Sequence, residues 1–142
     1  MTLKLRLTSE MTAEEMAPLW PGIVRCLEKY CRKFDGYETI QNIIAECAAG
    51  KRQLWVITDG DEVILAAVTE IITINATGKK QLVMAECGGS RYAECLELFH
   101  EMEDWARAQG ATEAVTHCRR GLVRLYEPMG FKTRSIVMTK DL

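Results

Sequence analysis

The chain has 142 residues, of which 48% are hydrophobic and 27% are charged, and its net charge is −2. These values exclude a disordered or membrane-embedded protein and fit a single globular domain over residues 1–142. The slight negative charge also argues against nucleic acid as the main partner, because phosphate binding usually requires a basic surface.

Neither a secretory signal nor a membrane span is expected. Residues 1–6 (MTLKLR) alternate polar and apolar side chains instead of forming the apolar stretch of a signal peptide. The longest apolar run, residues 63–72, contains Thr69 and Glu70 and is far shorter than the ~20 residues that a membrane span needs. We therefore expect a cytoplasmic protein that has no membrane partner.

The cysteines occur without any CxxC pair, and several lie within apolar periodic segments. A secreted protein of this size could pair them in disulfides, but without a signal peptide we interpret them as buried, reduced thiols. No spacing of cysteines and histidines matches a zinc site, so no metal is expected. The six cysteines are Cys26, Cys31, Cys47, Cys87, Cys95 and Cys118.

The first elements are predicted from alternation and from capping signals. Residues 3–7 (LKLRL) alternate and predict a strand. Thr12 and Glu15 have the spacing of a capping box, in which each side chain bonds the other residue's backbone N–H, so a short helix is expected to follow. Proline disfavours helical geometry in the residue before it, and Trp20-Pro21 therefore predicts a break in the helix.

Two further helices and three strands are predicted over the middle of the chain. Apolar residues recur at helical spacing over 22–34 and over 40–49, and two longer helices with a kink are an alternative to three separate ones. Residues 53–58 and 62–74 are strand-like and are separated by Asp-Gly-Asp, a strong hairpin signal. A second turn leads into a strand over 80–87.

The remaining segments alternate between helix and strand. The patterns predict a long helix over 91–109, a strand over 113–118, a short helix over 121–129 and a final strand over 131–140. Antiparallel hairpins are thus followed by a right-handed β–α–β crossover. This order predicts an α/β layered fold.

Three stretches in this order resemble the GNAT superfamily of N-acetyltransferases. They are 103–111 (EDWARAQGA) at the end of the long helix, 126–131 (YEPMGF, the pattern Y-x-x-x-G-F) and 137–142 (VMTKDL) in the predicted final strand. The resemblance implies a GNAT-like acyl-CoA N-acyltransferase fold. Its sheet is mixed and mostly antiparallel, and it is flanked by helices in three α/β/α layers.

The same resemblance implies a mechanism with acetyl-CoA as co-substrate, held between the fourth and fifth strands. A substrate amine would attack the thioester directly, and a base or a water chain would take its proton. Tyr126 matches the tyrosine that protonates the leaving thiolate, and a phenol of pKa about 10 is suited to that step. The structural alternative is that Tyr126 only packs at the end of a short helix.

The corner between strand 80–87 and the long helix is the candidate site for the pyrophosphate. The family signature (Q/R)-x-x-G-x-(G/A) falls on Ser90–Cys95, where Ala93 replaces the central glycine. Gly88-Gly89-Ser90 could instead form the cradle, with Arg91 pairing with phosphate, or the corner could be a structural turn. The candidate cofactor-binding residues are Cys87, Gly88, Gly89, Ser90, Arg91, Tyr92 and Ala93.

Glu70 and Glu86 are the candidate general bases, because they fall roughly opposite one another in the predicted hairpin. A carboxylate within an apolar strand has a raised pKa and can accept a proton near neutral pH. The resemblance favours Glu86, since GNAT enzymes often carry a glutamate on these central strands. Alternatively, both side chains point to solvent or pair with arginines.

Histidines and arginines supply weaker candidates. His117, at the end of the fifth strand, could deprotonate an amine, whereas His100 is expected to be exposed on the long helix. The basic group Arg119, Arg120 and Arg124 could contact the 3′-phosphate of CoA or an acidic partner, or it could form a solvated face.

A second resemblance leads to an alternative without catalysis. The stretches 53–56 (QLWV), 66–71 (AAVTEI) and 119–124 (RRGLVR), together with the Gly-Gly corner, are similar to a divergent GNAT subgroup encoded by phages and prophages. That similarity implies an inactive binding or virion-associated protein. Transfer of another acyl group, such as aminoacyl or succinyl, is a third option. The expected partners are a small-molecule or protein amine, and a second copy of the chain or a virion protein.

Overall fold

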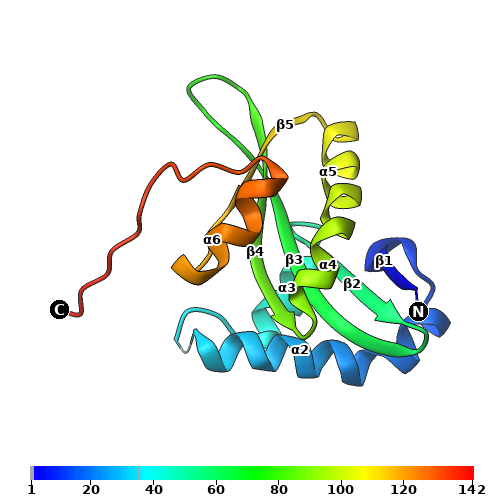
Figure 1. Ribbon diagram of the computed structural model, residues 1–142. Coiled ribbons are helices and arrows are strands. Elements are labelled where there is room, and N and C mark those ends of the chain that lie inside the picture. Colours follow the sequence, from blue (N-terminus) through cyan, green and yellow to red (C-terminus); the bar gives the residue numbers. More distant parts are fainter. Residues whose placement is uncertain (1, 35) are drawn as a thin grey trace.

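A computed structural model describes residues 2–34 and 36–142 as a twisted five-stranded sheet with helices on both faces (Figure 1). The spatial order of the strands follows the order of the sequence. The strands are β1 (Leu3–Leu7), β2 (Gln53–Asp59), β3 (Glu62–Thr73), β4 (Lys80–Gly89) and β5 (Ala111–Thr116).

The sheet is mixed and mostly antiparallel, as the sequence predicted. β1 to β4 are joined antiparallel, with a register shift in the β2–β3 and β3–β4 ladders, and only β4 and β5 pair in parallel. The crossover between β4 and β5 is the helical segment 92–108, since parallel neighbours cannot be joined by a tight turn. The predicted α/β/α layering is confirmed.

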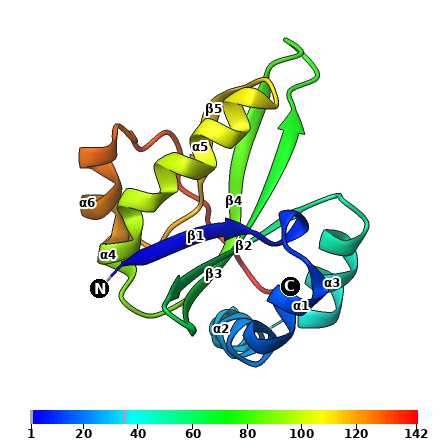
Figure 2. The same cartoon turned by 90° about the vertical axis from the view of Figure 1, so that its right-hand side faces the viewer.

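Helices cover both faces of the sheet (Figure 2). One face carries α1 (Ala13–Met16), α2 (Trp20–Lys33) and α3 (Ile40–Ala48). The other face carries α4 (Tyr92–Cys95), α5 (Phe99–Ala108) and α6 (Val123–Tyr126). Short 3₁₀ turns occur at Thr8–Glu10, Ala17–Leu19, Leu96–Leu98, Arg120–Leu122 and Glu127–Met129.

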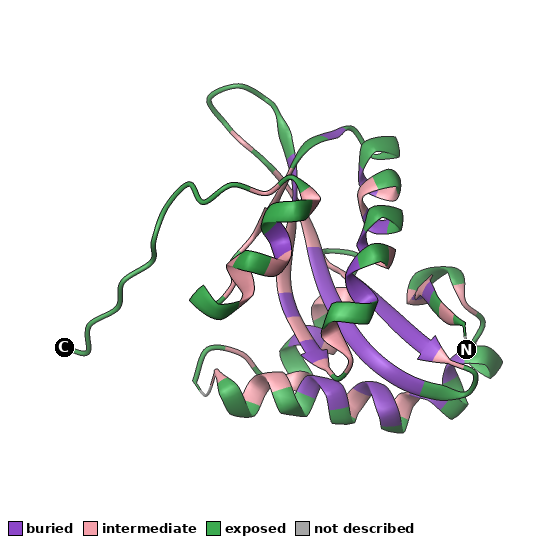
Figure 3. Cartoon of the chain, in the orientation of Figure 1, coloured by how far each residue is buried: buried purple, intermediate pink, exposed green. Residues whose placement is uncertain are grey.

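Each face of the sheet has its own apolar core. The core under α2 and α3 includes Ile23, Leu27, Val56 and Val68. The core under α5 includes Phe99 and Met102, together with Tyr126 from α6. Successive β2 and β3 residues point to opposite sides, so a strand such as 54–57 contributes to both cores, which explains its unbroken apolar run (Figure 3).

Two local predictions are wrong. Trp20-Pro21 does not break the helix but begins α2, because proline is tolerated in the first helical turn, where its missing N–H has no partner anyway. Residues 131–140 do not form a strand and extend away from the body of the protein. The capping box at Thr12 and Glu15 is confirmed by both of its hydrogen bonds.

Two helical segments are less regular than predicted. A 3₁₀ turn joins α1 to α2, so that the segment 13–33 is nearly continuous and α3 is separate, which is close to the alternative of two longer helices. The predicted long helix 91–109 is likewise α4, a 3₁₀ turn and α5. Within the described residues, no helix is long and apolar enough to cross a membrane.

The closest approach of helix to sheet depends on Gly88. A Cβ atom built on this residue would lie 2.1 Å from the carbonyl oxygen of Cys26 in α2 and 3.3 Å from the Cβ of Tyr30. The oxygen belongs to the helix backbone and cannot rotate away. Gly88 therefore allows α2 to lie directly on β4.

We predict that Gly88→Ala lowers the free energy of unfolding by about 1–3 kcal/mol, the usual range for overpacking a core. Gly121→Ala is the matched control, because a Cβ there meets no atom within 4 Å. Urea denaturation of the two variants measures the difference, and equal stabilities would contradict the role assigned to Gly88.

Candidate active site

The central feature of the candidate site is a gap in the sheet between β4 and β5. The two strands pair from Lys80 with Ala111 to Met84 with Thr116, and beyond that point their ladder ends. β4 continues for five more residues, to Gly89, paired only with β3. The rest of β4 and the loop after β5 are therefore not paired with one another, and this part of the sheet is here called the splay.

A bulge in β4 lies where the splay begins. Val68 pairs with Glu86 and Thr69 with Met84, so Ala85 has no direct partner on β3. A bulge bends its strand and changes the direction of the side chains that follow it. Because of this shift, Met84 and Cys87 both contact the α5 core, whereas Glu86 points toward α2 and α3.

Close packing accounts for the two glycines of the corner. Gly88 and Gly89 are the last residues of β4 and not a loop. Gly89 has φ +151°, and a Cβ there would lie 2.3 Å from the carbonyl oxygen of Ile64 in β3. The N–H of Ser90 donates to the same oxygen at 2.9 Å. Both glycines thus allow close backbone approach, and the Ser90 N–H is already used.

Arg91 is also engaged within the protein. It adopts a left-handed conformation with φ 50°. Its Nη1 lies 2.9 Å from Asp59, and its Nε lies 2.8 Å from Glu94. The guanidinium of Arg91 thus has two carboxylate partners within the protein, and Glu94 places negative charge in the first turn of α4.

Tyr126 lies on the α5 side of the splay and is almost fully buried. Its hydroxyl is hydrogen-bonded to that of Tyr92, and Phe131 packs against its ring with centroids 5.2 Å apart. Burial is the main cause that raises the pKa of Tyr126, and the thiols of Cys87 and Cys118 add to it. The phenol therefore stays protonated and can act as a donor.

Glu86 lies on the opposite side of the sheet, within a cluster of charges. Nη1 of Arg52 is 3.0 Å from Glu86 Oε1 and 3.1 Å from Glu38 Oε2. Nε of Arg52 is 2.6 Å from Glu46. One buried guanidinium therefore serves three carboxylates. Among the described residues, Oε2 of Glu86 is buried without a hydrogen-bond partner.

This environment raises the pKa of Glu86 to about 7. Burial is the largest cause, Arg52 opposes it, and the neighbouring carboxylate of Glu38 raises the pKa further. A carboxyl group with this pKa is partly ionised at neutral pH and can accept a proton.

The other sequence candidates are placed less favourably. Glu70 is partly exposed and pairs in register with Val83, whereas Glu86 pairs with Val68, so the two glutamates are not opposite one another. His117 is exposed at the end of β5. His100 is exposed on α5, as expected, and its Nδ1 is 3.2 Å from Glu103.

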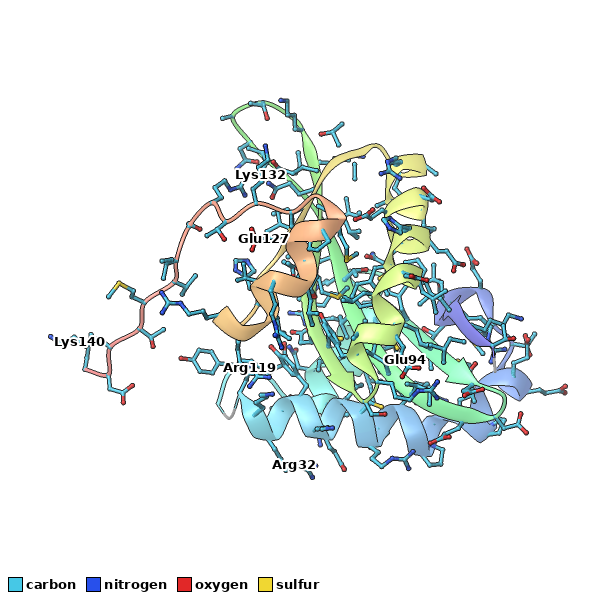
Figure 4. All side chains as sticks on the ribbon, viewed as in Figure 1. Arg32, Glu94, Arg119, Glu127, Lys132 and Lys140 are labelled. Carbon is cyan, nitrogen blue, oxygen red and sulfur yellow. The ribbon has the colours of Figure 1, made fainter. Side chains whose placement is uncertain are left out.

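Basic side chains gather at the open end of the splay. Nζ of Lys29 in α2 donates to the carbonyl oxygen of Gly89 at 2.8 Å. The pKa of Lys33 is lowered by partial desolvation and by the nearby cations of Arg119 and Lys29. Figure 4 shows Arg119, after β5, on the side that faces α2. Arg120 and Arg124 are exposed farther along this segment.

The sequence alone did not indicate four residues of the candidate site, which are Arg52, Glu38, Lys29 and Lys33. The partners of Glu86 lie 34 or more residues away in the chain, so no local spacing signals them. Lys29 and Lys33 stand four residues apart on one helix face, and this spacing could have indicated a basic surface.

The splay meets some of the requirements of acetyl-CoA and not others. The protonated phenol of Tyr126 beside the splay is the kind of group that the thioester end would need. The glycine cradle does not fit the pyrophosphate, because the space above Gly88 and Gly89 is filled. Any phosphate at this end of the splay would meet the side chains of Lys29, Lys33 and Arg119 instead.

The fold is shared with acetyltransferases of known structure. A Trypanosoma brucei acetyltransferase aligns with a TM-score of 0.68 at 14% identity, covering 99% of this chain and 100% of that one. A predicted acetyltransferase from Clostridium acetobutylicum, whose structure was solved with acetyl-CoA, aligns with a TM-score of 0.65 at 11% identity. The alignment covers 99% of this chain and 96% of that one. A GNAT family acetyltransferase from Staphylococcus aureus aligns with a TM-score of 0.63 at 12% identity, and the alignment covers all of both chains.

No protein-family model matches the sequence, and no curated protein matches it. At identities of 11–14%, the structural alignments establish the fold, which is that of GNAT acetyltransferases.

The raised pKa of Glu86 predicts a pH dependence of stability. The folded state holds this proton more tightly than the unfolded state, whose carboxyl has its ordinary pKa of 4.5. The resulting stabilisation is fully present below about pH 4.5 and is lost as the pH rises through about 7. Relative to Glu86→Gln, the wild-type free energy of unfolding should fall by about 1–3 kcal/mol over this range.

Urea denaturation at a series of pH values measures this difference. Glu28→Gln, an exposed position on α2, controls for the loss of one negative charge. A wild-type curve parallel to that of Glu86→Gln would show that the pKa of Glu86 is not raised.

Proposed function

We propose that this protein is an acetyl-CoA-dependent N-acetyltransferase that transfers an acetyl group to an amine. The observation that carries the proposal is the splay, with a protonated phenol on one side of the sheet and a carboxyl of pKa about 7 on the other. In this proposal the thioester would lie where the pairing of β4 and β5 ends, between the two faces. The shared fold with acetyltransferases supports the same reaction class.

The reaction needs one proton acceptor and one proton donor. Acetyl-CoA would supply a thioester carbonyl carbon that accepts the lone pair of a neutral amine. A C–N bond forms, the C–S bond breaks, and the sulfur leaves with the electron pair of that bond. Glu86 takes the proton that the amine nitrogen loses, directly or through water, and Tyr126 gives a proton to the thiolate. Acids and bases positioned in this way typically contribute 10²- to 10⁴-fold each.

Glu86 is a better base than Glu70 in this arrangement. Its unpartnered Oε2 is available to a proton, while Oε1 is held by Arg52. Three carboxylates around one guanidinium also leave a net negative charge, which favours a cationic amine over a neutral or acidic acceptor. Glu70 is partly exposed and has none of these contacts.

Tyr126 is suited to proton donation because burial keeps its phenol protonated. Its hydroxyl is hydrogen-bonded to that of Tyr92, which holds it in place on the α5 side of the splay.

The phosphates of acetyl-CoA would be held by side chains in this protein. Lys29, Lys33 and Arg119 meet at the end of the splay, where the glycine corner offers no cradle. Cationic side chains bind phosphate without requiring close backbone approach.

A second candidate function is binding without acetyl transfer. It is favoured by the glycine corner, because Gly88, Gly89, Ser90 and Arg91 are all engaged in packing or ion pairs. In that case the GNAT fold would serve as a binding or virion-associated module. The similarity to phage-encoded sequences supports this candidate.

Binding of acetyl-CoA separates these two functions. A ligand that binds only the folded state raises the melting temperature in proportion to its concentration over Kd. We expect acetyl-CoA and CoA to raise the melting temperature of the wild type. Lys33→Ala and Arg119→Ala should each reduce the affinity by about tenfold, which corresponds to a charged hydrogen bond of about 1.5 kcal/mol.

Lys51→Ala, an exposed lysine before β2, is the control and should bind as the wild type does. The absence of any shift at millimolar acetyl-CoA would exclude the acetyltransferase and favour the binding module.

Tyr126→Phe and Glu86→Gln test the two catalytic roles. With a polyamine as acceptor and thiol release as the readout, each change should lower kcat by about 10²-fold or more. For the wild type, kcat/KM should rise with pH through about 7, as Glu86 ionises. Glu70→Gln separates the two glutamates, since a larger loss in that variant than in Glu86→Gln would transfer the role of base to Glu70.

A further inference from the structure

A groove runs along β1, at the opposite edge of the sheet from β5, and is here called the β1 groove. Figure 2 shows β1 across the front of the molecule, with α5 above it. The groove has a volume of about 360 Å³, within the range of about 300–1,000 Å³ that is usual for small-molecule sites. It is lined by β1, the turn after it, α1, β2 and α5, and by nothing from β4 or β5. The β1 groove is therefore separate from the splay.

The floor of the β1 groove is apolar and largely aromatic. Trp55 from β2 is almost fully buried, and its Nε1 donates to Oγ1 of Thr69 at 2.8 Å, which fixes the indole. Trp105 from α5 is half-buried and packs edge-on against Trp55, with ring centroids 5.5 Å apart. Leu5 and Leu7 of β1 complete this floor. A ligand of the groove therefore needs an apolar or aromatic portion.

Lys4 and Arg6 form a positive wall of the β1 groove. They alternate along β1 with residues that pack in the α5 core, so their side chains lie on the side of the strand away from α5. Nε of Arg6 is buried and has no hydrogen-bond partner among the described residues. Nη1 of Arg6 is 3.9 Å from Oε2 of Glu15, which is too long for a hydrogen bond. A carboxylate is the group that such a guanidinium binds best, through two parallel N–H···O bonds.

Carboxylates line the groove from other elements. Glu101 belongs to α5 and Glu10 to the turn after β1, and both are exposed. Glu101 precedes Trp105 by four residues on the helix, so the two side chains are neighbours. An ammonium group at this point would meet a carboxylate and also the indole, which attracts cations through its ring face. The α5 side of the groove thus favours a positive charge.

The charges that can bind a ligand are balanced in sign. Glu15 also lines the groove, but its Oε1 accepts a hydrogen bond from the backbone N–H of Thr12 in the capping box. The other charged side chains of the lining are two bases on β1 and two acids outside it. A ligand without net charge that carries one charge of each sign is complementary to this arrangement.

We propose that the β1 groove binds a free α-amino acid with an apolar or aromatic side chain. The carboxylate of the amino acid pairs with Arg6 and Lys4, its ammonium group lies at Glu101 beside Trp105, and its side chain packs on the apolar floor. A purely anionic or purely cationic ligand would leave one set of these charges without a partner. The site does not depend on the acetyl transfer proposed above, because it shares no strand with the splay.

Titration of the full chain with phenylalanine, followed by proton–nitrogen NMR spectra, tests the site. We expect shifts of the indole N–H of Trp105 and of the backbone amides of residues 4–7, whereas the indole N–H of Trp20, outside the groove, should stay unchanged. Phenethylamine lacks the carboxylate and hydrocinnamate lacks the ammonium group. Each should bind about tenfold more weakly than phenylalanine, as expected for the loss of a charged hydrogen bond. Glycine, which has no side chain to pack on the tryptophans, should also bind more weakly.

Two variants locate the charges that bind the amino acid. Arg6→Ala and Glu101→Gln should each weaken phenylalanine binding by about tenfold. Because Nε of Arg6 has no partner within the described residues, its removal should leave the melting temperature close to that of the wild type. Arg32→Ala and Glu28→Gln remove the same charges from exposed positions on α2, and these controls should bind as the wild type does.

Several results would overturn the proposal. The first is the absence of any shift at millimolar phenylalanine, and the second is a set of shifts confined to the splay. Equal affinities for phenylalanine and phenethylamine would indicate a site for amines, and equal affinities for phenylalanine and hydrocinnamate a site for carboxylates. Unchanged binding in Arg6→Ala and Glu101→Gln would show that neither charge holds the ligand.

Discussion

The end of hydrogen bonding between β4 and β5 determines what the rest of this structure can do. Pairing stops at Met84 and Thr116, while β4 continues to Gly89 along β3. Had the two strands stayed together, the sheet would separate the α5 side from the α2 side completely. Because the pairing ends there, Tyr126 on one face and Glu86 on the other lie on opposite sides of the part of β4 that β5 no longer accompanies.

The position of α2 follows from the same strand. Gly88 lets the helix backbone approach β4 so closely that no side chain fits between them. This contact brings Lys29 to the carbonyl oxygen of Gly89, and it places Lys33 near Arg119. The glycine corner thus shapes the end of the splay by positioning a basic helix.

The charge cluster around Arg52 is the second constraint. A buried guanidinium is stable only with anionic partners, and this one has Glu38, Glu46 and Glu86. The three carboxylates cannot all be fully compensated by one cation. The most buried of them, Glu86, therefore has the raised pKa, and its free oxygen is available to a proton. The ion pairs of Arg52 and the raised pKa of Glu86 thus have the same cause, since one positive charge is shared among three carboxylates.

Local pattern in the sequence determined much of the fold. Alternation and turn residues placed β2, β3 and β4 within two residues of their observed ends, and the motifs around Trp105 and Tyr126 indicated the correct fold. These features depend on residues that are close together in the chain, so the sequence alone shows them. Tyr126 could be named as a candidate because of the resemblance to GNAT enzymes, and Glu86 because a carboxylate within an apolar strand has a raised pKa.

Only the tertiary structure decided the role of the glycine corner, the partners of Glu86 and the conformation of residues 131–140. Gly88 packs against the carbonyl oxygen of a residue 62 positions earlier, and the pKa of Glu86 is set by Arg52 and Glu38. These partners are far away in the chain, so no local sequence pattern indicates them. The strand-like sequence of 131–140 records a preference for extended pairing, but a strand needs a partner. Whether that partner lies in the same chain is decided by geometry, and here the chain itself leads this segment away from its own sheet.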